Sequence, residues 1–302
     1  MNRVLITGIT GKNGRYLLKE METNREELKD VHFKFFLRES SDSTYIDKSS
    51  LDIEKYVGDI DTYEGALEFT KGNYDTILHI AGIQRSIPVV KAAIENGVKR
   101  FVLVHTTGIY SKYKAAGEGY RQIDAEVTQM CKVANVSLTI LRPTMIYGDL
   151  KDGNVSVFIK MVDRLRIFPV ISGAKYELQP VWCGDLAKAY YDVLMNPDIT
   201  ENKNYDLSGG EPIKLIEMFK EMGRQLGVKN TFVSCPYWIA YSGAWFVYIL
   251  TLGKKDFREK VQRMVEPRVY SHEAASKDFG YNPLCFADGV KEEIEMYKKA
   301  NR

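Results

Sequence analysis

The chain has 302 residues, of which 45% are hydrophobic and 27% are charged, and its formal net charge is +2. This balance is typical of a globular protein with enough residues for one large domain or two closely joined ones. No long run of basic or acidic residues occurs, which excludes the usual signature of a nucleic-acid partner.

The first element predicted along the chain is a strand that leads into a glycine-rich turn. Val4–Thr7 is mainly apolar, and Gly8-Ile9-Thr10-Gly11-Lys12-Asn13-Gly14 follows it directly. From Arg15 to Met21, apolar residues recur at helical spacing. Glycines allow a ligand to approach the backbone closely, and the start of a helix offers N–H groups to a phosphate. Between a strand and a helix, this motif predicts dinucleotide binding.

Strand and helix patterns then alternate through the first half of the chain. Strands are predicted at 3–7, 32–37, 55–57, 76–80, 100–105 and 137–141, the last ended by Arg142-Pro143, and helices at about 86–96 and 116–134. Such alternation is typical of parallel strands joined by helices. We therefore predict an α/β fold with a doubly wound parallel sheet of the Rossmann kind.

The second half of the chain is less regular. We expect a helix over 185–195 with Asp185 at its cap, a strand at 205–207, and a helix over 212–226 ended by Gly227. No low-complexity linker occurs, so two lobes should pack together. The expected division is a dinucleotide-binding domain at 1–148 and a smaller C-terminal α/β substrate lobe at 149–302, from which about 178–207 returns to the sheet.

Residues 231–253 form an uncharged segment that ends at Lys254-Lys255. Its length comes close to a bilayer span, but Pro236 and Gly243 interrupt it. We favour a buried helix of the C-terminal lobe. The alternatives are a surface that contacts a membrane or a lipid-like substrate, and an oligomer interface.

The cysteines indicate the redox environment of the protein. They lie far apart and form no CxxC pair: Cys131, Cys183, Cys235 and Cys285. This spacing is typical of reduced thiols, so we expect a cytoplasmic protein. No histidine is placed at ligand spacing from a cysteine or another histidine, so we expect no metal site.

Eight motifs occur in the order in which a known family has them. They are VLITGITGKNGR at 4–15, GDI at 58–60, HIAG at 79–82, FVLVHTTGIY at 101–110, TILRPTMIYG at 139–148, QPVWCGDLAKA at 179–189, SGGEPI at 208–213 and KDFGYNP at 277–283. Together they resemble the NAD(P)-dependent epimerase/dehydratase group of extended and atypical short-chain dehydrogenases/reductases. The glycine motif with Arg15 resembles the NmrA-like branch.

The resemblance implies a pyridine nucleotide across the carboxyl ends of the strands, with a small-molecule substrate, often a nucleotide-sugar, in the cleft beside the C-terminal lobe. Asp59 and Ile60 match positions that border the adenine, and Ala81 and Gly82 match positions where the backbone approaches the cofactor. The cofactor-binding set expected from the glycine motif and the resemblance is Gly8, Thr10, Gly11, Lys12, Asn13, Gly14, Arg38, Asp59, Ile60, Ala81, Gly82 and Thr106.

The end of the second strand indicates which nucleotide fits. A carboxylate there favours NAD, and an arginine suits the 2′-phosphate of NADP. The strand ends at Phe36-Leu37-Arg38, with Lys12 as a second cation, and Glu39 follows directly. We prefer NADP, with NAD as the alternative.

The catalytic residues implied by the resemblance are incomplete. Thr106 matches the hydroxyl position and Tyr120 the tyrosine of Tyr-x-x-x-Lys, but Asp124 stands where the lysine is expected. The alternative is the literal Tyr-x-x-x-Lys of Tyr110 and Lys114, with Tyr113 beside it. Two histidines, His79 and His105, fall at predicted strand ends, where we expect each to be a hydrogen-bonded structural residue.

Two classes of function remain open. One is an NAD(P)-dependent oxidoreductase or epimerase/dehydratase that acts by hydride transfer on a sugar nucleotide or a related polar metabolite. The other is a catalytically weak or inactive NADP-binding sensor or scaffold of the NmrA-like kind. Asp124 in place of a lysine favours the sensor, and the C-terminal lobe with its QPVW and GYNP segments favours the enzyme.

Overall fold

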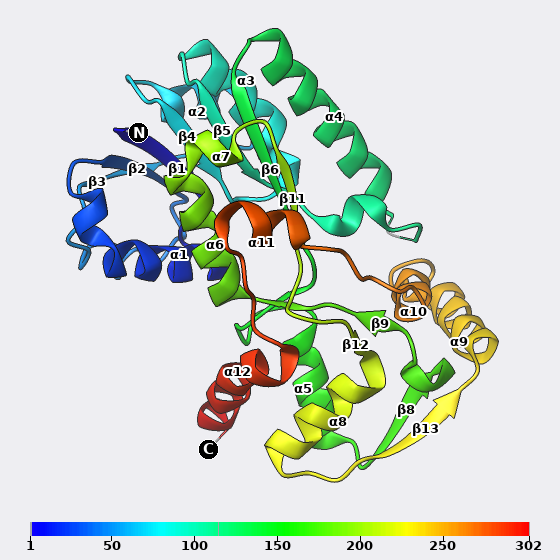
Figure 1. The fold of residues 1–302 in the computed structure, drawn as a ribbon. Coiled ribbons are helices and arrows are strands. Elements are labelled where there is room, and N and C mark those ends of the chain that lie inside the picture. The colour runs from blue at the N-terminus through cyan, green and yellow to red at the C-terminus, as the bar shows by residue number, and fades with distance from the viewer. Residues whose placement is uncertain (1, 114, 302) are drawn as a thin grey trace.

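A parallel sheet of seven strands forms the centre of the computed structural model, which describes residues 2–113 and 115–301 (Figure 1). The strand order is β11-β6-β5-β4-β1-β2-β3. The strands are β1 (Arg3–Thr7), β2 (His32–Leu37), β3 (Ile53–Val57), β4 (Thr76–His79), β5 (Arg100–Val104), β6 (Ser137–Pro143) and β11 (Asn204–Leu207). Because the order reverses beside β1, the carboxyl ends of β1 and β4 border a crevice of the kind in which such sheets bind ligands.

Helices cover both faces of this sheet. On one face α1 (Lys12–Thr23) packs against α6 (Cys183–Met195), and on the other α2 (Tyr63–Thr70), α3 (Ser86–Glu95) and α4 (Gly117–Val133) lie in sequence. Successive residues of β1 alternate between the two cores: Val4 and Ile6 join the first, and Leu5 joins the second. This alternation explains why the strand is apolar throughout its buried length. The doubly wound parallel sheet is confirmed.

A smaller C-terminal lobe has its own core. Its helices are α5 (Val155–Arg164), α8 (Leu215–Leu226), α9 (Tyr237–Leu250), α10 (Arg258–Met264) and α12 (Phe286–Ala300). Three small strand pairs accompany them: β7 (Ile146–Tyr147) with β10 (Val181–Trp182), β9 (Glu177–Leu178) with β12 (Ile213–Lys214), and β8 (Ile167–Ile171) with β13 (Thr231–Cys235). The short helices α7 (Pro197–Thr200) and α11 (Glu273–Phe279) flank β11. Four 3₁₀ turns occur in the described part of the chain, at 25–28, 83–85, 107–110 and 172–174.

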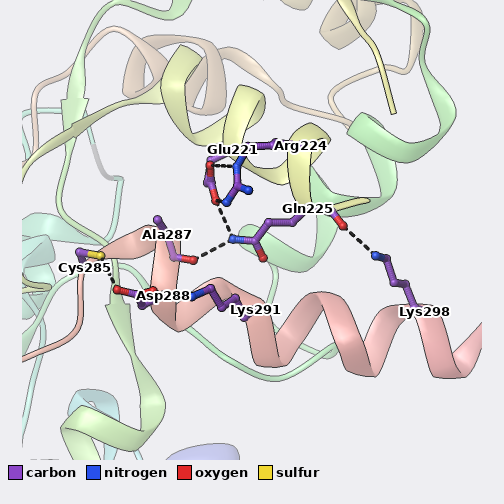
Figure 2. A network of polar contacts seen from close by, with 8 residues as sticks. All are labelled: Glu221, Arg224, Gln225, Cys285, Ala287, Asp288, Lys291 and Lys298. Carbon is purple, nitrogen blue, oxygen red and sulfur yellow. Dashed lines mark hydrogen bonds and ion pairs between the residues drawn. The ribbon is translucent and has the colours of Figure 1, made fainter. Parts of the chain in front are cut away.

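A polar network joins α8 to α12 at the surface of this lobe (Figure 2). The Gln225 amide donates to Glu221 Oε1 and to the Ala287 carbonyl, at 2.7 Å each. Lys298 Nζ donates to the Gln225 carbonyl at 2.7 Å. Because Gln225 bonds to both helices, the network fixes α12 on the apolar core below it.

The chain crosses between the two lobes more than once. β11 lies beside β6 in the large sheet, although it follows α5 and α6 in the sequence. Both halves of the chain therefore build the large sheet. We keep the division near residue 148 as a proposal.

Several boundaries differ from the predicted ones by one to three residues, and three of the differences have a clear local cause. β6 continues through Arg142 and Pro143, because Pro143 pairs only with Leu207 of β11 and needs no second ladder bond. α8 begins at Leu215, since Ile213 and Lys214 pair with β9. Asp185 is not the cap of α6, which begins at Cys183 after Trp182; its carboxylate accepts from Leu284 N at 2.9 Å.

The prediction of a buried helix at 231–253 is wrong. Pro236 separates a strand, β13, from the helix α9, and Ala244 is the one buried residue that α9 contributes. Trp238 is 68% exposed and Phe246 58% exposed. Within the described residues, no helix combines the length and the apolar character that a membrane crossing requires.

Candidate functional site

A cavity of about 280 Å³ lies at the carboxyl ends of β1, β2 and β4. We call it the first cavity. It is lined by Gly8, Thr10, Gly11, Lys12, Asn13, Phe36, Arg38, Asp59, Ile60, Asp61, Ile80, Ala81, Gly82 and Arg85. Ten residues expected to bind the cofactor thus surround one cavity. Of the remaining two, Gly14 lies within α1 and Thr106 lies at a neighbouring cavity.

The β1–α1 turn requires glycines because an added Cβ would collide with neighbouring backbone atoms. A Cβ on Gly8, which has a φ of +81°, would lie 2.8 Å from Ala81 N. A Cβ on Gly14 would lie 2.3 Å from the carbonyl oxygen of Ile9. The turn is therefore packed backbone against backbone, and α1 begins at Lys12 with its first N–H groups at the cavity. This cradle fits a phosphate.

Ser41 connects the glycine turn to the end of β2. Its hydroxyl lies 3.3 Å from Thr10 Oγ1 and accepts from Arg38 N at 3.1 Å. Arg38 is exposed, and its guanidinium forms no ion pair with any described residue. Glu39 is not among the described lining residues. The end of β2 therefore offers a cation to the first cavity.

The opposite wall of the first cavity is set by the loop after β3. Asp59 Oδ1 accepts from Asp61 N at 2.7 Å, and Ile60 is buried. Asp61 forms an ion pair with Arg85, which also donates to the Ala81 carbonyl at 3.2 Å. This pairing connects the wall that carries Asp59 to the turn after β4.

A second cavity, of about 260 Å³, lies between the sheet and the C-terminal lobe. It is lined by Lys12, Thr106, Thr107, Gly108, Ser111, Thr144, Met145, Ile146, Asn154, Leu178, Gln179, Arg263, Arg268 and Tyr270. Lys12 lines both cavities. The second cavity therefore adjoins the first at the start of α1.

Two arginines give the second cavity its positive charge. Arg263 and Arg268 each have a buried Nε with no hydrogen-bond partner among the described residues. The pKa of Arg268 is lowered to about 10, mainly by burial and in addition by the nearby charge of Arg263. The Arg268 side chain therefore remains a cation at neutral pH. The unused donors of the two arginines suit an anionic group.

Thr106 and Tyr120 lie at different places around the site. The Thr106 hydroxyl accepts from Gly108 N at 3.0 Å, and the residue lines the second cavity. Tyr120, on α4, accepts at its hydroxyl from Gln84 Nε2 at 3.1 Å. Tyr120 is not among the described residues that line either cavity. Gln84 lies two residues after Gly82, so this hydrogen bond places the Tyr120 hydroxyl beside the turn after β4.

The alternative pair cannot be tested as a pair, because Lys114 lies outside the described residues. Tyr110 donates to Asp206 Oδ1 at 3.2 Å, and its ring centroid lies 5.2 Å from that of Tyr270. Burial raises the pKa of Tyr110, and the Asp206 carboxylate raises it further. These shifts oppose a role for Tyr110 as a base.

Asp124 occupies a structural network. One carboxylate oxygen lies 2.7 Å from His105 Nδ1, and the other accepts from Arg142 at 2.7 Å. His105 Nε2 lies 3.1 Å from Ser86 Oγ. Burial lowers the pKa of His105, although the hydrogen bond to Asp124 opposes this shift. The expected lysine position is thus filled by a carboxylate that holds two partners.

His79 is a buried, hydrogen-bonded residue, as we expected. Its Nδ1 lies 2.7 Å from Thr7 Oγ1, and its Nε2 lies 3.2 Å from the Gly82 carbonyl. Because a carbonyl can only accept, Nε2 donates and Nδ1 accepts in the neutral ring. Burial lowers the pKa of His79 to about 3, helped by the nearby His105. His79 therefore joins β1 to the Gly82 turn as a neutral group.

Sequence patterns missed several residues of both cavities. Ser41 could have been found in the cluster Ser40-Ser41-Asp42-Ser43 after Arg38. Arg263 and Arg268 carry no motif; a bridge to Leu178 holds Arg268 at the second cavity, and Arg263 reaches the cavity from α10. Among the described residues, no group of three or more His, Cys, Asp or Glu side chains is arranged to hold a metal.

Known proteins with similar sequences or structures are distant relatives. No protein-family model matches the chain. A UDP-glucose 4-epimerase from Vibrio cholerae is 18% identical over 233 residues, which cover 72% of this chain and 68% of that protein.

Solved structures match over nearly the whole length. The UDP-glucose 4-epimerase of Thermotoga maritima with UDP-glucose has a TM-score of 0.74 at 17% identity, covering 99% of this chain and 100% of that one. An NADPH-dependent quinone oxidoreductase from Escherichia coli has a TM-score of 0.69 at 15% identity, covering 98% and 99%. The UDP-glucose 4-epimerase of Thermus thermophilus in complex with NAD has a TM-score of 0.69 at 16% identity, covering 99% of each chain. The chain therefore has the fold of these epimerases and of this reductase, which agrees with the resemblance of its motifs to the epimerase/dehydratase group.

Proposed function

We propose that this protein is an NAD(P)-dependent oxidoreductase or epimerase/dehydratase whose substrate is a small anionic metabolite, such as a nucleotide-sugar. The observation that carries the proposal is the position of Lys12 between two cavities. The first has the glycine cradle and Arg38. The second is lined by Lys12, Arg263 and Arg268 and by no described acidic residue.

The first cavity fits a nicotinamide dinucleotide, which supplies reversible hydride transfer when bound. The N–H groups at the start of α1 would hold its phosphates, and Ala81 and Gly82 would lie along it. Arg38 and Lys12 would favour the 2′-phosphate of NADP. Of the matched structures, one is named as NADPH-dependent and another was solved with NAD. They support a nicotinamide cofactor and either form of it.

The second cavity fits a substrate with a phosphate or a diphosphate. The guanidinium groups of Arg263 and Arg268 would bind this anion, and Thr106 would hold the carbinol oxygen of the substrate. A matched epimerase was solved with UDP-glucose. The resemblance assigns the proton transfer to Tyr120, whose hydroxyl accepts from Gln84 outside the described lining of both cavities.

A sensor without turnover is the second candidate. Asp124 favours it, because this carboxylate is committed to His105 and Arg142 and cannot supply the lysine's charge to Tyr120. Such a protein would bind NADP with the same residues and lack the reaction.

A binding and turnover experiment separates these functions. NADP-saturated protein is titrated with UDP-glucose, and product formation is followed by chromatography, for wild type and for Arg268→Gln. We expect binding that weakens at least tenfold in Arg268→Gln, while NADP affinity stays unchanged. Arg166→Gln, at an exposed arginine outside both cavities, is the matched control. Bound NADP with no anion binding in wild type would contradict the enzyme and support the sensor.

A further inference from the structure

The helix α9 presents an apolar surface that the fold leaves uncovered. Trp238, Trp245, Phe246 and Ile249 are 44–68% exposed and recur at helical spacing, with Leu252 at 89% just beyond the helix. The inner side of α9 packs on α10, where the Arg258 guanidinium lies 4.0 Å from the Tyr248 ring centroid. In Figure 1 both helices lie at the outer side of the C-terminal lobe, away from the large sheet. We call the four exposed residues and Leu252 the α9 face.

Two cations lie at the end of the α9 face, where Lys254 and Lys255 follow Leu252 and Gly253 directly. No Asp or Glu occurs from Met222 to Lys255, and the next acidic residues, Asp256 and Glu259, are paired with Arg258 and Arg263. Lys254 and Lys255 are exposed and form no ion pair with a described residue. An apolar face with a cationic border complements a surface that is apolar beneath and anionic above.

The dimensions of α9 exclude a crossing and suit a helix that lies flat. Its 14 residues span about 21 Å, short of the ~30 Å hydrocarbon core of a bilayer. Its tryptophans and tyrosines are the side chains that prefer the boundary between lipid chains and headgroups. If two copies paired through their α9 faces, Lys254 and Lys255 of both copies would lie in one interface. Residues 222–255 supply no acidic residue to neutralise them.

We propose that the α9 face docks onto an anionic membrane surface, with its aromatic residues in the interface and Lys254 and Lys255 on the lipid headgroups. The α9–α10 unit is also joined to the rim of the second cavity. Glu266, just after α10, accepts from Ser111 Oγ at 2.7 Å and from Lys112 N at 2.9 Å. Docking through α9 would hold that cavity close to the bilayer.

Vesicle sedimentation of the full chain tests the proposal. Vesicles of phosphatidylcholine mixed with phosphatidylserine are compared with phosphatidylcholine alone, for wild type and for the double variant Trp245→Glu/Phe246→Glu. We expect wild type to bind the mixed vesicles, with binding that falls as salt rises, and the double variant to bind at least tenfold more weakly. Lys254→Gln/Lys255→Gln should lose the preference for phosphatidylserine.

Val133→Glu is the control, because Val133 is a 75% exposed apolar residue on α4, far along the chain from α9. NADP affinity and the melting temperature show that each variant remains folded, and neither readout depends on the membrane. Wild type that sediments with neither vesicle overturns the proposal. An equal loss of vesicle binding in Val133→Glu also overturns it. So does a stable wild-type dimer, seen by light scattering, that only the α9 variants dissociate.

Discussion

Asp124 Oδ1 lies 2.7 Å from Nδ1 of the fully buried His105 side chain. The other oxygen of this carboxylate neutralises Arg142, whose side chain is 8% exposed. Burial raises the pKa of Asp124, but the hydrogen bonds from His105 and Arg142 outweigh it and lower the pKa overall. Asp124 is therefore a charged structural residue at the position where the resemblance implies a lysine.

Asp124→Lys should destabilise the protein by roughly 3–5 kcal/mol. The new cation would face Arg142 and leave it buried without a partner, which is the costly way to break a buried ion pair. Urea unfolding measures the loss, and Glu126→Lys, at an exposed acid on the same helix, should stay within about 0.5 kcal/mol of wild type. A fully stable Asp124→Lys protein with faster turnover would show that the network is dispensable.

His79 should make stability fall with acidification. Its pKa is about 3 in the folded chain against an ordinary 6.5, so only the unfolded chain gains a proton between these values. The stabilisation is complete above about pH 6.5 and declines by about 1.4 kcal/mol per pH unit as the pH falls toward 3. The lowered pKa of His105 acts in the same direction.

Unfolding of wild type and His79→Asn at about pH 7.5 and about pH 5 measures this dependence. Between about pH 7.5 and about pH 5, the free energy of unfolding should fall by about 2 kcal/mol more for wild type than for His79→Asn. Equal losses in the two proteins would mean that His79 does not carry the shift.

The N-terminal half of the fold was predictable because its strands have a simple environment. A strand such as β1 is buried on both faces, so its apolar run indicates a strand, and the glycines after it indicate the turn that lines the first cavity. The prediction of a buried helix at 231–253 failed because an uncharged run does not reveal which side of a helix packs against the rest of the protein. α9 is apolar on all sides, and its exposure follows from the position of α10.

The second cavity was only partly predictable for a related reason. Thr106 came from a motif, and Gln179 lies in the quoted QPVW segment. Arg268 reaches the cavity through a tertiary contact with Leu178, which no local spacing encodes. Such long-range contacts between lobes leave no periodic pattern in a single sequence.

Tyr120→Phe should lower turnover by about 10²- to 10⁴-fold if the protein is an enzyme, because a positioned acid–base group contributes on that scale. NADP affinity should remain nearly constant, since Tyr120 lies outside the described lining of the first cavity. Steady-state kinetics and calorimetry measure the two effects. Tyr110→Phe is the comparison: if it abolishes turnover and Tyr120→Phe does not, the proton carrier is Tyr110.

Gly11→Val should weaken dinucleotide binding at least tenfold, about 1.4 kcal/mol. A Cβ on Gly11 would lie 3.2 Å from the Gly8 carbonyl oxygen, at the turn that lines the first cavity. Calorimetry measures the affinity. Gly119→Ala, on α4 with no neighbouring atom within 4 Å of the added Cβ, should bind as wild type. Unchanged affinity in a folded Gly11→Val protein would place the nucleotide elsewhere.

The most direct measurement is a calorimetric titration of the wild-type chain with NADPH and with NADH, repeated on Arg38→Ala and on Lys29→Ala. Lys29 is an exposed cation before the opposite end of β2 and serves as the charge control. We predict that wild type and Lys29→Ala bind NADPH more tightly than NADH, and that Arg38→Ala narrows this difference by roughly 1–3 kcal/mol. A wild-type preference for NADH would contradict the role of Arg38, and a folded wild-type chain that binds neither dinucleotide would contradict the assignment of the first cavity.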